Sequence, residues 1–447
     1  MLGAMRTRAL LPPLALLLLA GACARPPHAG LDPARTLADL QRPGTLPAGD
    51  LPAALTAAAW RDHPDLDLAR AELDAARAGI RTAGAIPNPS FGFGATKAEG
   101  VPQPWTLTYG LTFPVELGGK RRLRIRQAEL QVQDAQLAVA DTAWRLRMGV
   151  RGALVDWRQA RESAALAERS AALWAELLAL QDRRLALGGI AAPERAATAQ
   201  SALRAVAARL AAQAALRRAG TALALAAGVP EPAIAPRLAA DPPPDLAPEA
   251  APPPPAAQAL IHRLDVRRVL LAWDRNETAL DQELAQRVPN LQIGPGYSFD
   301  QGVKKWSLGL TLNLPIFDQR QGPIAEALAR RKVIEARLRQ TEAQALAAAG
   351  LAEARLATAQ AALAAQGQAL ADAESRLAAA RRAFALGGLD RGALAAAELE
   401  ALQARGLAVD TWAEAARARL AVEDAFQKPL DPAERPYPFD PTQGVKP

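Results

Sequence analysis

The segment from Trp105 to Phe113, with the sequence WTLTYGLTF, alternates without a break between large apolar residues and small or polar ones. Strict alternation of this length is typical of a strand whose two faces meet different environments. Most of the remaining sequence is rich in Ala and Arg and predicts helix. We therefore expect a mainly α-helical protein whose few strands have one apolar and one polar face.

Three further segments, 90–96, 291–299 and 306–314, alternate in the same way. Their polar positions are uncharged, and the charged residues collect in the loops 97–104 and 300–305. Two amphipathic hairpins on a soluble core would alternate similarly, but no other predicted sheet could cover these aromatic faces. Strands that are apolar outward and polar inward are typical of transmembrane β-barrels. The side chains predicted to face a water-filled lumen are Thr106, Thr108, Thr112, Ser307, Thr311 and Asn313.

Four strands are too few to close into a barrel. An open sheet edge in lipid leaves unpaired backbone groups at a cost of several kcal/mol each, and the smallest barrels have about eight strands. The strands of one chain must therefore combine with those of other copies. This argument predicts an oligomer without fixing the number of subunits.

The sequence repeats itself at an offset of about 200 residues. Each half contains two strand-like segments, a long helical segment, a Gly-Gly turn and a returning helix, which indicates an internal two-fold repeat. The corresponding pairs are IPNPSFGFG (86–94) with VPNLQIGPG (288–296), WTLTYGLTFP (105–114) with WSLGLTLNLP (306–315), and LALGGI (185–190) with FALGGL (384–389).

Two long helices are expected at 116–187 and 322–386. About 70 residues at 1.5 Å rise give a rod of roughly 105 Å. Apolar residues of the first helix keep a seven-residue period in two seams about 200° apart, which predicts a neighbouring helix on each side. The first seam is Leu123, Leu130, Leu137 and Trp144, and the second is Val132, Val139, Leu146 and Ala153.

The shorter helices 191–228 and 257–287 together match the length of one long helix, as do 390–425 and an N-terminal helix at 55–85. We expect each sum to form one returning leg, which gives four long coiled-coil legs and four strands per chain. The segment 229–256 contains eleven prolines. It is expected to pack outside the legs near mid-height.

The N-terminus combines a basic start, an apolar run and small residues before Cys23, which indicates a secretory signal. The box AGAC ending at Cys23 resembles a lipobox, so we expect lipid anchoring at this single cysteine; an ordinary signal peptide is the alternative. The expected organisation is a signal peptide (1–22), a lipid-anchored linker (23–54), a first repeat (55–228), a Pro-rich linker (229–256), a second repeat (257–427) and a Pro-rich C-terminal tail (428–447).

The net charge of +7 is attributed to solvated arginine on helices, because an exported protein does not meet the genome. One cysteine cannot form a thiolate cluster, and His28, His63 and His262 lie far apart, so no metal site is expected. No nucleophile–histidine–acid set or cofactor loop is visible. We therefore expect no enzymatic activity, no cofactor and no nucleic-acid partner.

Together these features resemble the TolC-like outer-membrane efflux protein family over residues 55–427. The supporting motifs are the duplicated strand pair, FPVELGGKRRLRIRQAE (113–129), LPIFDQRQGPIAEA (314–327) and the paired LGG turns. The stretch ELGGKR (116–121) is similar to the cobalt–zinc–cadmium type of heavy-metal efflux subunit. The resemblance implies a homotrimer in the outer membrane, whose twelve-stranded β-barrel continues into a twelve-helix periplasmic tunnel.

The resemblance further implies a passive conduit that exports metal ions or drugs from periplasm to exterior. Its partners would be a periplasmic adaptor protein and an inner-membrane pump of the RND type. In the family the far end of the helices meets the adaptor, although a simple helix-reversal turn could carry the same glycines. The implied contact residues are Leu187, Gly188, Gly189, Ile190, Leu386, Gly387, Gly388 and Leu389.

Some family members narrow this end with a ring of aspartates. Here the usual acidic positions hold Gly392, Ala393 and Ala396, and Asp390 is the nearest carboxylate. The resemblance therefore makes Asp390 the candidate gate residue. A solvated acid at a helix start is the alternative.

Two further alternatives stay open. The basic cluster 120–126 fits either lipid phosphates below the bilayer or a solvated helix start. A periplasmic coiled-coil scaffold or adaptor lipoprotein would share the long helices. Such an adaptor should also contain soluble strands with charged faces, which the sequence does not predict.

Overall fold

A computed structural model describes residues 30–40, 45–246, 257–431, 434 and 437. The chain divides into two compact units, Met1–Pro43 and Gly44–Pro447. Helix α2 (Pro33–Leu40) belongs to the first unit, and the elements described below belong to the second. The expected signal peptide (1–22) and lipid-anchored Cys23 lie outside the described residues.

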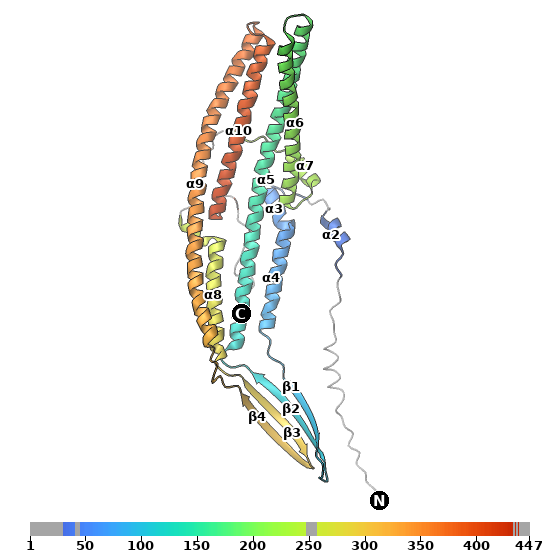
Figure 1. Ribbon diagram of the computed structural model, residues 1–447, viewed down its shortest axis with the longest axis vertical. Helices are drawn as coiled ribbons and strands as arrows, with labels where there is room; N and C mark the ends of the chain where they lie inside the picture. Colours follow the sequence, from blue (N-terminus) through green and yellow to red (C-terminus); the bar gives the residue numbers. More distant parts are fainter. Residues whose placement is uncertain (1–29, 41–44, 247–256, 432–433, 435–436, 438–447) are drawn as a thin grey trace. The chain divides into compact units, whose positions relative to one another are not determined.

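The strands form one antiparallel sheet in the order β1-β2-β3-β4 (Figure 1). Neighbouring strands in this order are also neighbours in the sequence, and β2 and β3 join the two halves of the chain. The four segments predicted from their alternation are confirmed as strands. Their bounds are Ser90–Lys97 (β1), Trp105–Val115 (β2), Leu291–Asp300 (β3) and Val303–Leu312 (β4).

Strand β4 begins at Val303, earlier than the alternation from residue 306 predicted. The connection between β3 and β4 is reduced to Gln301 and Gly302, whose φ angles are 48° and 90°. Two successive positive φ angles are typical of a type I′ hairpin, which matches the twist of paired strands. Lys304 and Lys305 therefore belong to the strand and not to a loop.

Helices α5 (Lys120–Ala186) and α9 (Gln321–Ala385) contain 67 and 65 residues. At 1.5 Å per residue, α5 is about 100 Å long, close to the predicted rod. It begins four residues later than predicted because Gly118 and Gly119 both have a φ of 72°. Among the described residues, no helix is long and apolar enough to span a membrane.

The N-terminal helix predicted at 55–85 is two helices. Pro64 has no backbone N–H to donate and keeps His63 extended, with φ −74° and ψ 128°, so the helix is interrupted there. The shorter elements are α3 (Leu51–Asp62), α4 (Pro64–Ala83), α6 (Ala192–Ala227), α7 (Glu231–Ala239), η1 (Ala257–His262), α8 (Leu264–Gln286) and α10 (Arg391–Phe426).

The two predicted seams of α5 pack against different helices, as expected. Leu130 and Leu137 of the first seam form a buried cluster with Leu271 of α8. Val132 and Val139 of the second seam are buried with residues of α4. Helix α5 therefore has a neighbour on each side.

The helices that make up each of the two split legs differ from those predicted. Helices α10 and α8 both lie between α5 and α9 (Figure 1). The backbone N–H of Leu264 at the start of α8 donates to Gln427 Oε1 at 2.6 Å, just beyond the end of α10. The helix at 257–287 thus completes the leg of α10 and not that of α6. The sequence argument failed because it used length alone, and the half-legs have similar lengths.

Helix α6 is completed by the N-terminal helices. A side chain at Gly228, the residue that ends α6, would lie 3.0 Å from the Cα atom of His63 between α3 and α4. The resulting order of legs is α6 with α4, then α5, then α10 with α8, then α9. This order follows that of the strands to which the legs connect.

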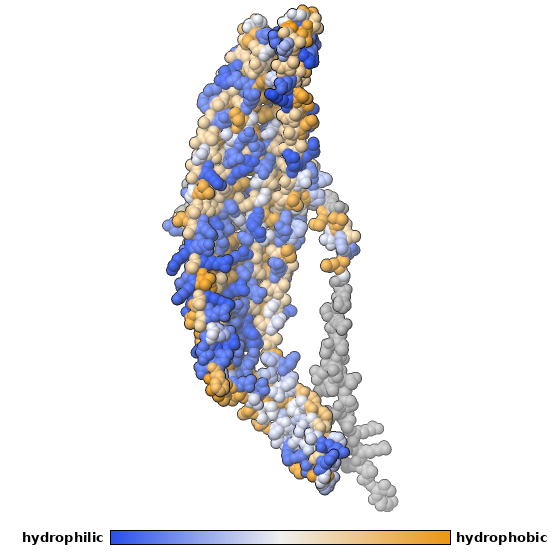
Figure 2. All heavy atoms as spheres, viewed as in Figure 1, coloured by the Kyte–Doolittle hydropathy of each residue, from blue (hydrophilic) through white to orange (hydrophobic). Residues whose placement is uncertain are grey.

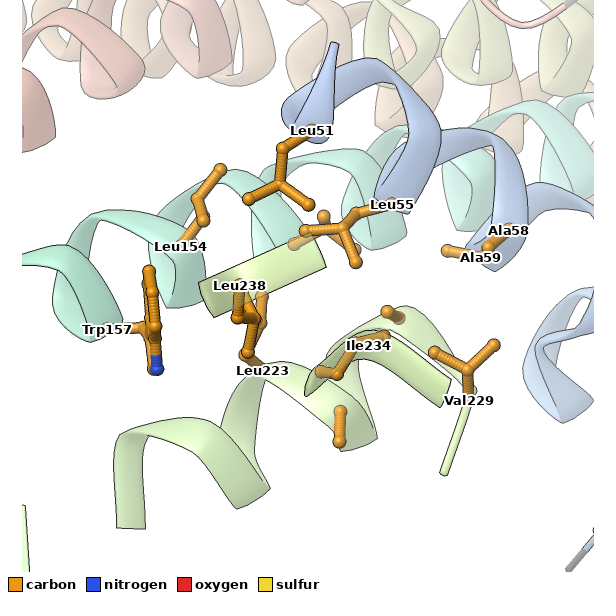
Figure 3. Packing of buried hydrophobic residues seen from close by; sticks show 13 residues of the cluster. Leu51, Leu55, Ala58, Ala59, Leu154, Trp157, Leu223, Val229, Ile234 and Leu238 are labelled. Carbon is orange, nitrogen blue, oxygen red and sulfur yellow. The ribbon is translucent and has the colours of Figure 1, made fainter. Parts of the chain in front are cut away.

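A hydrophobic core at this joint contains residues of four helices (Figure 3). Leu55 of α3, Leu223 of α6 and Ile234 of α7 are fully buried in it. Part of the Pro-rich segment expected at 229–256 is therefore folded, because α7 packs its apolar face against α6 and its neighbours. Residues 247–256 lie outside the described part.

Candidate functional site: sheet, junctions and hairpin turns

One face of the sheet carries a row of aromatic side chains. Phe93, Tyr109, Tyr297 and Trp306, one from each strand, pair directly across the sheet. Their ring centroids are 5.2, 6.2 and 4.9 Å apart from one neighbour to the next. Trp306 is 83% exposed and Phe93 is 58% exposed, so nothing in the described chain covers this face.

The opposite face is polar and carries few large side chains. Gly92, Gly110 and Gly296 pair across three strands and continue to Ser307. The predicted lumen residues Thr106, Thr108, Thr112, Ser307 and Thr311 lie on this face. Asn313 follows the last residue of β4.

The polar face also holds two charges that the sequence argument assigned to a loop. Asp300 accepts a hydrogen bond from the Thr106 hydroxyl at 2.7 Å and pairs with Lys305 at 2.7 Å. Both charged residues lie near the β3–β4 turn, where the register aligns Thr106 with Asp300. They neutralise each other, so this face carries no net charge from this pair.

The edges of the molecule are open. Within the described residues, strands β1 and β4 each pair with a neighbouring strand on one side only. Helices α6 and α9 likewise pack on one side, and each exposes apolar residues. On α6, Leu203, Val206 and Leu210 form one row; on α9, Val333 and Leu351 share a face and Leu346 lies on another.

Three basic residues of the 120–126 cluster hold the junction between β2 and α5. Lys120 is buried and donates to Val288 O at 2.7 Å and to Asn290 Oδ1 at 2.6 Å, and its burial lowers its pKa. Arg121 donates to Gly84 O at 2.7 Å. Arg124 forms a salt bridge with Glu116, which lowers the pKa of that carboxyl. These cations satisfy carbonyl groups at the ends of α4 and α8, as helix C-termini favour.

The two Gly-Gly turns have the same geometry at the ends of α5 and α9 farthest from the sheet (Figure 1). Gly188 and Gly387 have φ angles of 68° and 73°. Gly189 N–H donates to Arg184 O at 2.7 Å, and Gly388 N–H donates to Ala383 O at 2.9 Å. Each turn is therefore a Schellman motif with its first glycine in the left-handed position.

Each motif exposes the leucine before its glycines. Leu187 is 87% exposed and Leu386 is 88% exposed. Covering an exposed leucine with a partner surface would contribute about 1.5–3 kcal/mol. The turns therefore present two apolar side chains on rigid backbone, while Ile190 and Leu389 are half-buried beside them.

Asp390 caps helix α10. Its carboxylate accepts a hydrogen bond from Ala393 N at 2.8 Å and pairs with Arg184 of α5 at 3.3 Å. These two interactions lower its pKa. The candidate gate carboxylate thus already has partners within its own chain.

The next residue, Arg391, joins the α5–α6 hairpin to the α9–α10 hairpin with more hydrogen bonds than Asp390 does. It forms two hydrogen bonds to Glu176 of α5, at 2.6 and 2.7 Å, and one to Glu398 at 2.9 Å. Sequence reasoning missed this residue because its partner Glu176 is 215 positions away. The hairpins α5–α6 and α9–α10 are therefore tied together near their turns.

Sequence reasoning also missed a buried charge network at mid-height. Arg147 of α5 pairs with Glu423 of α10 at 2.6 Å and with Glu434 at 2.8 Å. Arg151 reaches the other oxygen of Glu434 at 2.8 Å. The one sequence signal that could have suggested this network is an arginine among the apolar seams of a long helix. The partners of that arginine are far away in the sequence, so the pairing itself leaves no local pattern.

Residues 55–229 match the family described as "Outer membrane efflux protein". No curated protein matches the chain.

Solved structures share the fold at low sequence identity. The outer membrane protein VceC from Vibrio cholerae is 21% identical, with a TM-score of 0.66 over 85% of this chain and 97% of that one. A membrane protein from Pseudomonas aeruginosa is 19% identical, with a TM-score of 0.70 over 86% and 91% of the two chains. CusC, whose transmembrane channel formation has been studied, is 16% identical, with a TM-score of 0.66 over 86% and 93%. The resemblance to the TolC-like outer-membrane efflux proteins is thus confirmed, with residues 55–229 matching that family and the chain sharing the fold of its channels.

Proposed function

We propose that this chain is one subunit of a trimeric outer-membrane channel, a passive conduit in a tripartite efflux system. The observation that supports the proposal is that, on each side of the subunit, an open edge of the sheet coincides with an open edge of the helical layer. Strand β1 and helix α6 lie at one edge of the subunit, and strand β4 and helix α9 lie at the other.

Pairing of β4 of one copy with β1 of the next would satisfy both strand edges, which is required in lipid. The same arrangement would bring the face of α9 that carries Val333 and Leu351 beside the apolar row of α6, and these residues are exposed in the single chain. Three copies would supply twelve strands and twelve legs. The number three comes from the family resemblance, and the need for closure comes from the physics of unpaired strands.

The aromatic face of the sheet would then contact hydrocarbon and the Thr/Gly face would contact water. At mid-height, Arg158 holds Asp241 with two hydrogen bonds of 2.8 Å, and Arg147 holds Glu434 on the same side of α5. We assign this side to the exterior, because the attached segments would otherwise obstruct the tunnel.

The hairpin turns would meet a periplasmic adaptor, through which an RND-type inner-membrane pump loads the conduit. The exposed Leu187 and Leu386 support this proposal, because an end-on partner would cover them. Asp390 would act at this end as a salt-bridged pair with Arg184 and not as a bare carboxylate. Lipid anchoring at Cys23, after removal of residues 1–22, is part of the same proposal.

The cargo would be metal ions or drugs, and the resemblance of residues 116–121 favours metals. Deletion of this chain, followed by resistance measurements across divalent metals and drugs, tests the conduit. We expect sensitivity to the exported class, restored by the intact chain. Unchanged resistance to every compound would contradict the proposal.

Membrane fractionation separates the conduit from the alternative scaffold or adaptor lipoprotein. A chain held only through Cys23 would be released from the membrane by a Cys23→Ala substitution in an exported form. The proposed conduit would remain integral and would require detergent for extraction.

A further inference from the structure

Exposed apolar side chains lie at the junctions where the strands of the sheet meet the helical legs. Phe317, between β4 and α9, is 96% exposed. Figure 2 shows hydrophobic residues gathered where α8 and α9 meet the sheet. All four junctions contribute to this set, which consists of Ile86, Leu117, Val288, Leu314, Ile316 and Phe317.

The basic cluster of α5 lies at the same level. Lys120, Arg121 and Arg124 are used within the chain, because they bind backbone carbonyls, Asn290 and Glu116. A purely structural explanation therefore accounts for three of the cations and leaves Arg122 and Arg126.

Arg122 and Arg126 are exposed and lie one turn apart on α5. Within the described chain, Arg122 has no ion pair, and Arg126 approaches Glu129 only to 3.7 Å. The two arginines line a shallow groove together with Arg121, Ile125 and Glu129. Residues at this spacing have Cβ atoms about 5–6 Å apart, so both guanidinium groups can reach one phosphate.

The groove lies on the exterior side assigned above. Positions 126, 133, 140 and 147 recur at the seven-residue spacing of α5, so Arg126 shares a face with Arg147. Arg147 holds Glu434 on that face. A ligand of Arg122 and Arg126 would therefore approach from outside the tunnel, beside the apolar junction residues.

We propose that Arg122 and Arg126 bind the phosphate of an anionic phospholipid headgroup in the membrane leaflet that adjoins the junction. Guanidinium groups bind phosphate oxygens with paired, charge-assisted hydrogen bonds. The exposed apolar residues at this level favour a lipid over free phosphate, because acyl chains can cover them. This inference rests on the proposed membrane position of the sheet.

The test compares lipid binding by the full chain, purified in a neutral detergent. Phosphatidylglycerol or phosphatidylcholine is added, and bound lipid is counted by native mass spectrometry. A basic residue near an anionic lipid surface raises binding about fivefold, so we expect Arg122→Gln with Arg126→Gln to lower the preference for phosphatidylglycerol at least about tenfold. The matched control is Arg204→Gln with Arg218→Gln, two exposed arginines of α6 that lie far from the sheet and on another face than Leu203 and Leu210, which should leave the preference unchanged.

The outcomes separate this inference from the proposed function. An unchanged lipid preference in the Arg122/Arg126 variant, with oligomer and efflux intact, would overturn the headgroup site alone. Inorganic phosphate that competes equally well with phosphatidylglycerol would also overturn the assignment to lipid. A wild-type chain that fails to integrate into bilayers would overturn the proposed function, and the headgroup site with it.

Discussion

Arg147 of α5 and Glu423 of α10 form a buried ion pair, in which Nη2 and Oε2 are 2.6 Å apart and the side chains are 1% and 6% exposed. Glu434 completes the pair from the chain beyond α10, and Arg147 also lies over the ring of Trp144 at 5.0 Å. The network lies where α10 ends and α8 begins, since Arg263 of the α8 start bonds to Ala425 O. It therefore joins the middle helix to the joint of a split leg.

Replacing Arg147 with Met should destabilise the protein strongly. The change leaves the carboxylates of Glu423 and Glu434 buried without their main partner. Removal of one member of a buried pair typically costs about 3–5 kcal/mol. The measurement is the free energy of unfolding in denaturant, followed by circular dichroism at fixed protein and detergent concentration.

Two controls identify the cause of that loss. Combining Arg147→Met with Glu423→Leu and Glu434→Leu should recover much of the stability, because the ion pairs of Arg147 are removed with both partners and the remaining cation, Arg151, is 22% exposed. Arg355→Met removes an exposed arginine of α9 and should change the free energy by less than about 0.5 kcal/mol. Equal losses for Arg147→Met and Arg355→Met would show that the buried pair contributes nothing.

The same network predicts a dependence on pH. Burial alone would raise the pKa of Glu434, but the hydrogen bond from Arg147 and the charges of Arg151 and Arg147 hold it below the ordinary value of 4.5. A carboxyl whose pKa is lower in the folded state stabilises the fold above its unfolded pKa, and this contribution is lost as pH falls through the folded pKa.

We therefore expect wild type to unfold at a higher temperature than Glu434→Gln at pH 7, and the difference to shrink as the pH falls below about 4.5. Thermal scans of both proteins from pH 7 to pH 3 provide the measurement. A difference that stays constant over this range would contradict the assignment to Glu434.

The strands and the long helices could be predicted because their signals are local. Alternation from Trp105 to Phe113 and the two seams of α5 each depend on neighbours within a few residues. The pairing of half-legs was wrong because it depends on which elements meet in space. The contacts that assign α8 to α10, such as those of Leu264 with Gln427 and of Arg263 with Ala425, join residues 163 and 162 positions apart.

The features of the candidate site likewise divide into those with a local sequence signal and those that depend on distant residues. The glycine turns were visible because Gly188 and Gly387 are required by local backbone geometry. The partners of Asp390 and Arg391 were invisible because Arg184 and Glu176 lie more than 200 positions away. The burial of Lys120 could not be predicted either, because the carbonyl of Val288 to which it donates lies 168 positions away in the sequence.

The first glycine of each turn should be sensitive to substitution for reasons of backbone conformation alone. A Cβ atom at Gly188 would meet nothing within 4 Å, so space does not restrict the residue. Its φ of 68° does, and we expect Gly188→Ala to weaken the local turn by about 1–2 kcal/mol. Amide exchange at Gly189, which bonds to Arg184 O, reports the loss.

Two controls separate conformation from size. Gly188→Asn should cost less, because Asn tolerates the left-handed region. Gly189→Ala should also cost less, because Gly189 has no positive φ and a Cβ there would lie 3.4 Å from Arg184 O. Equal losses at Gly188 and Gly189 would show that a general disturbance of the turn is responsible.

Neighbouring strand positions should report opposite environments. In membranes, Thr108→Cys should react with a charged, membrane-impermeant thiol reagent, and Leu107→Cys should be protected by hydrocarbon. In detergent-free denaturant both should react equally, which controls for intrinsic reactivity. Reaction at Leu107→Cys with protection at Thr108→Cys would invert the assignment of faces and contradict the proposed lumen.

The apolar row on α6 should control assembly without controlling the fold of the subunit. Leu203 is 71% exposed and Leu210 is 55% exposed, so aspartate at both positions would remain solvated in a single chain. In the proposed oligomer the same carboxylates would be buried against α9 of the next copy, at a cost of several kcal/mol per charge. We therefore expect the double variant to keep the helical circular-dichroism spectrum of wild type but to run as a monomer in light scattering. Loss of helical signal would instead mean that the row belongs to the core of one subunit, and an unchanged oligomer would place the contact between copies elsewhere.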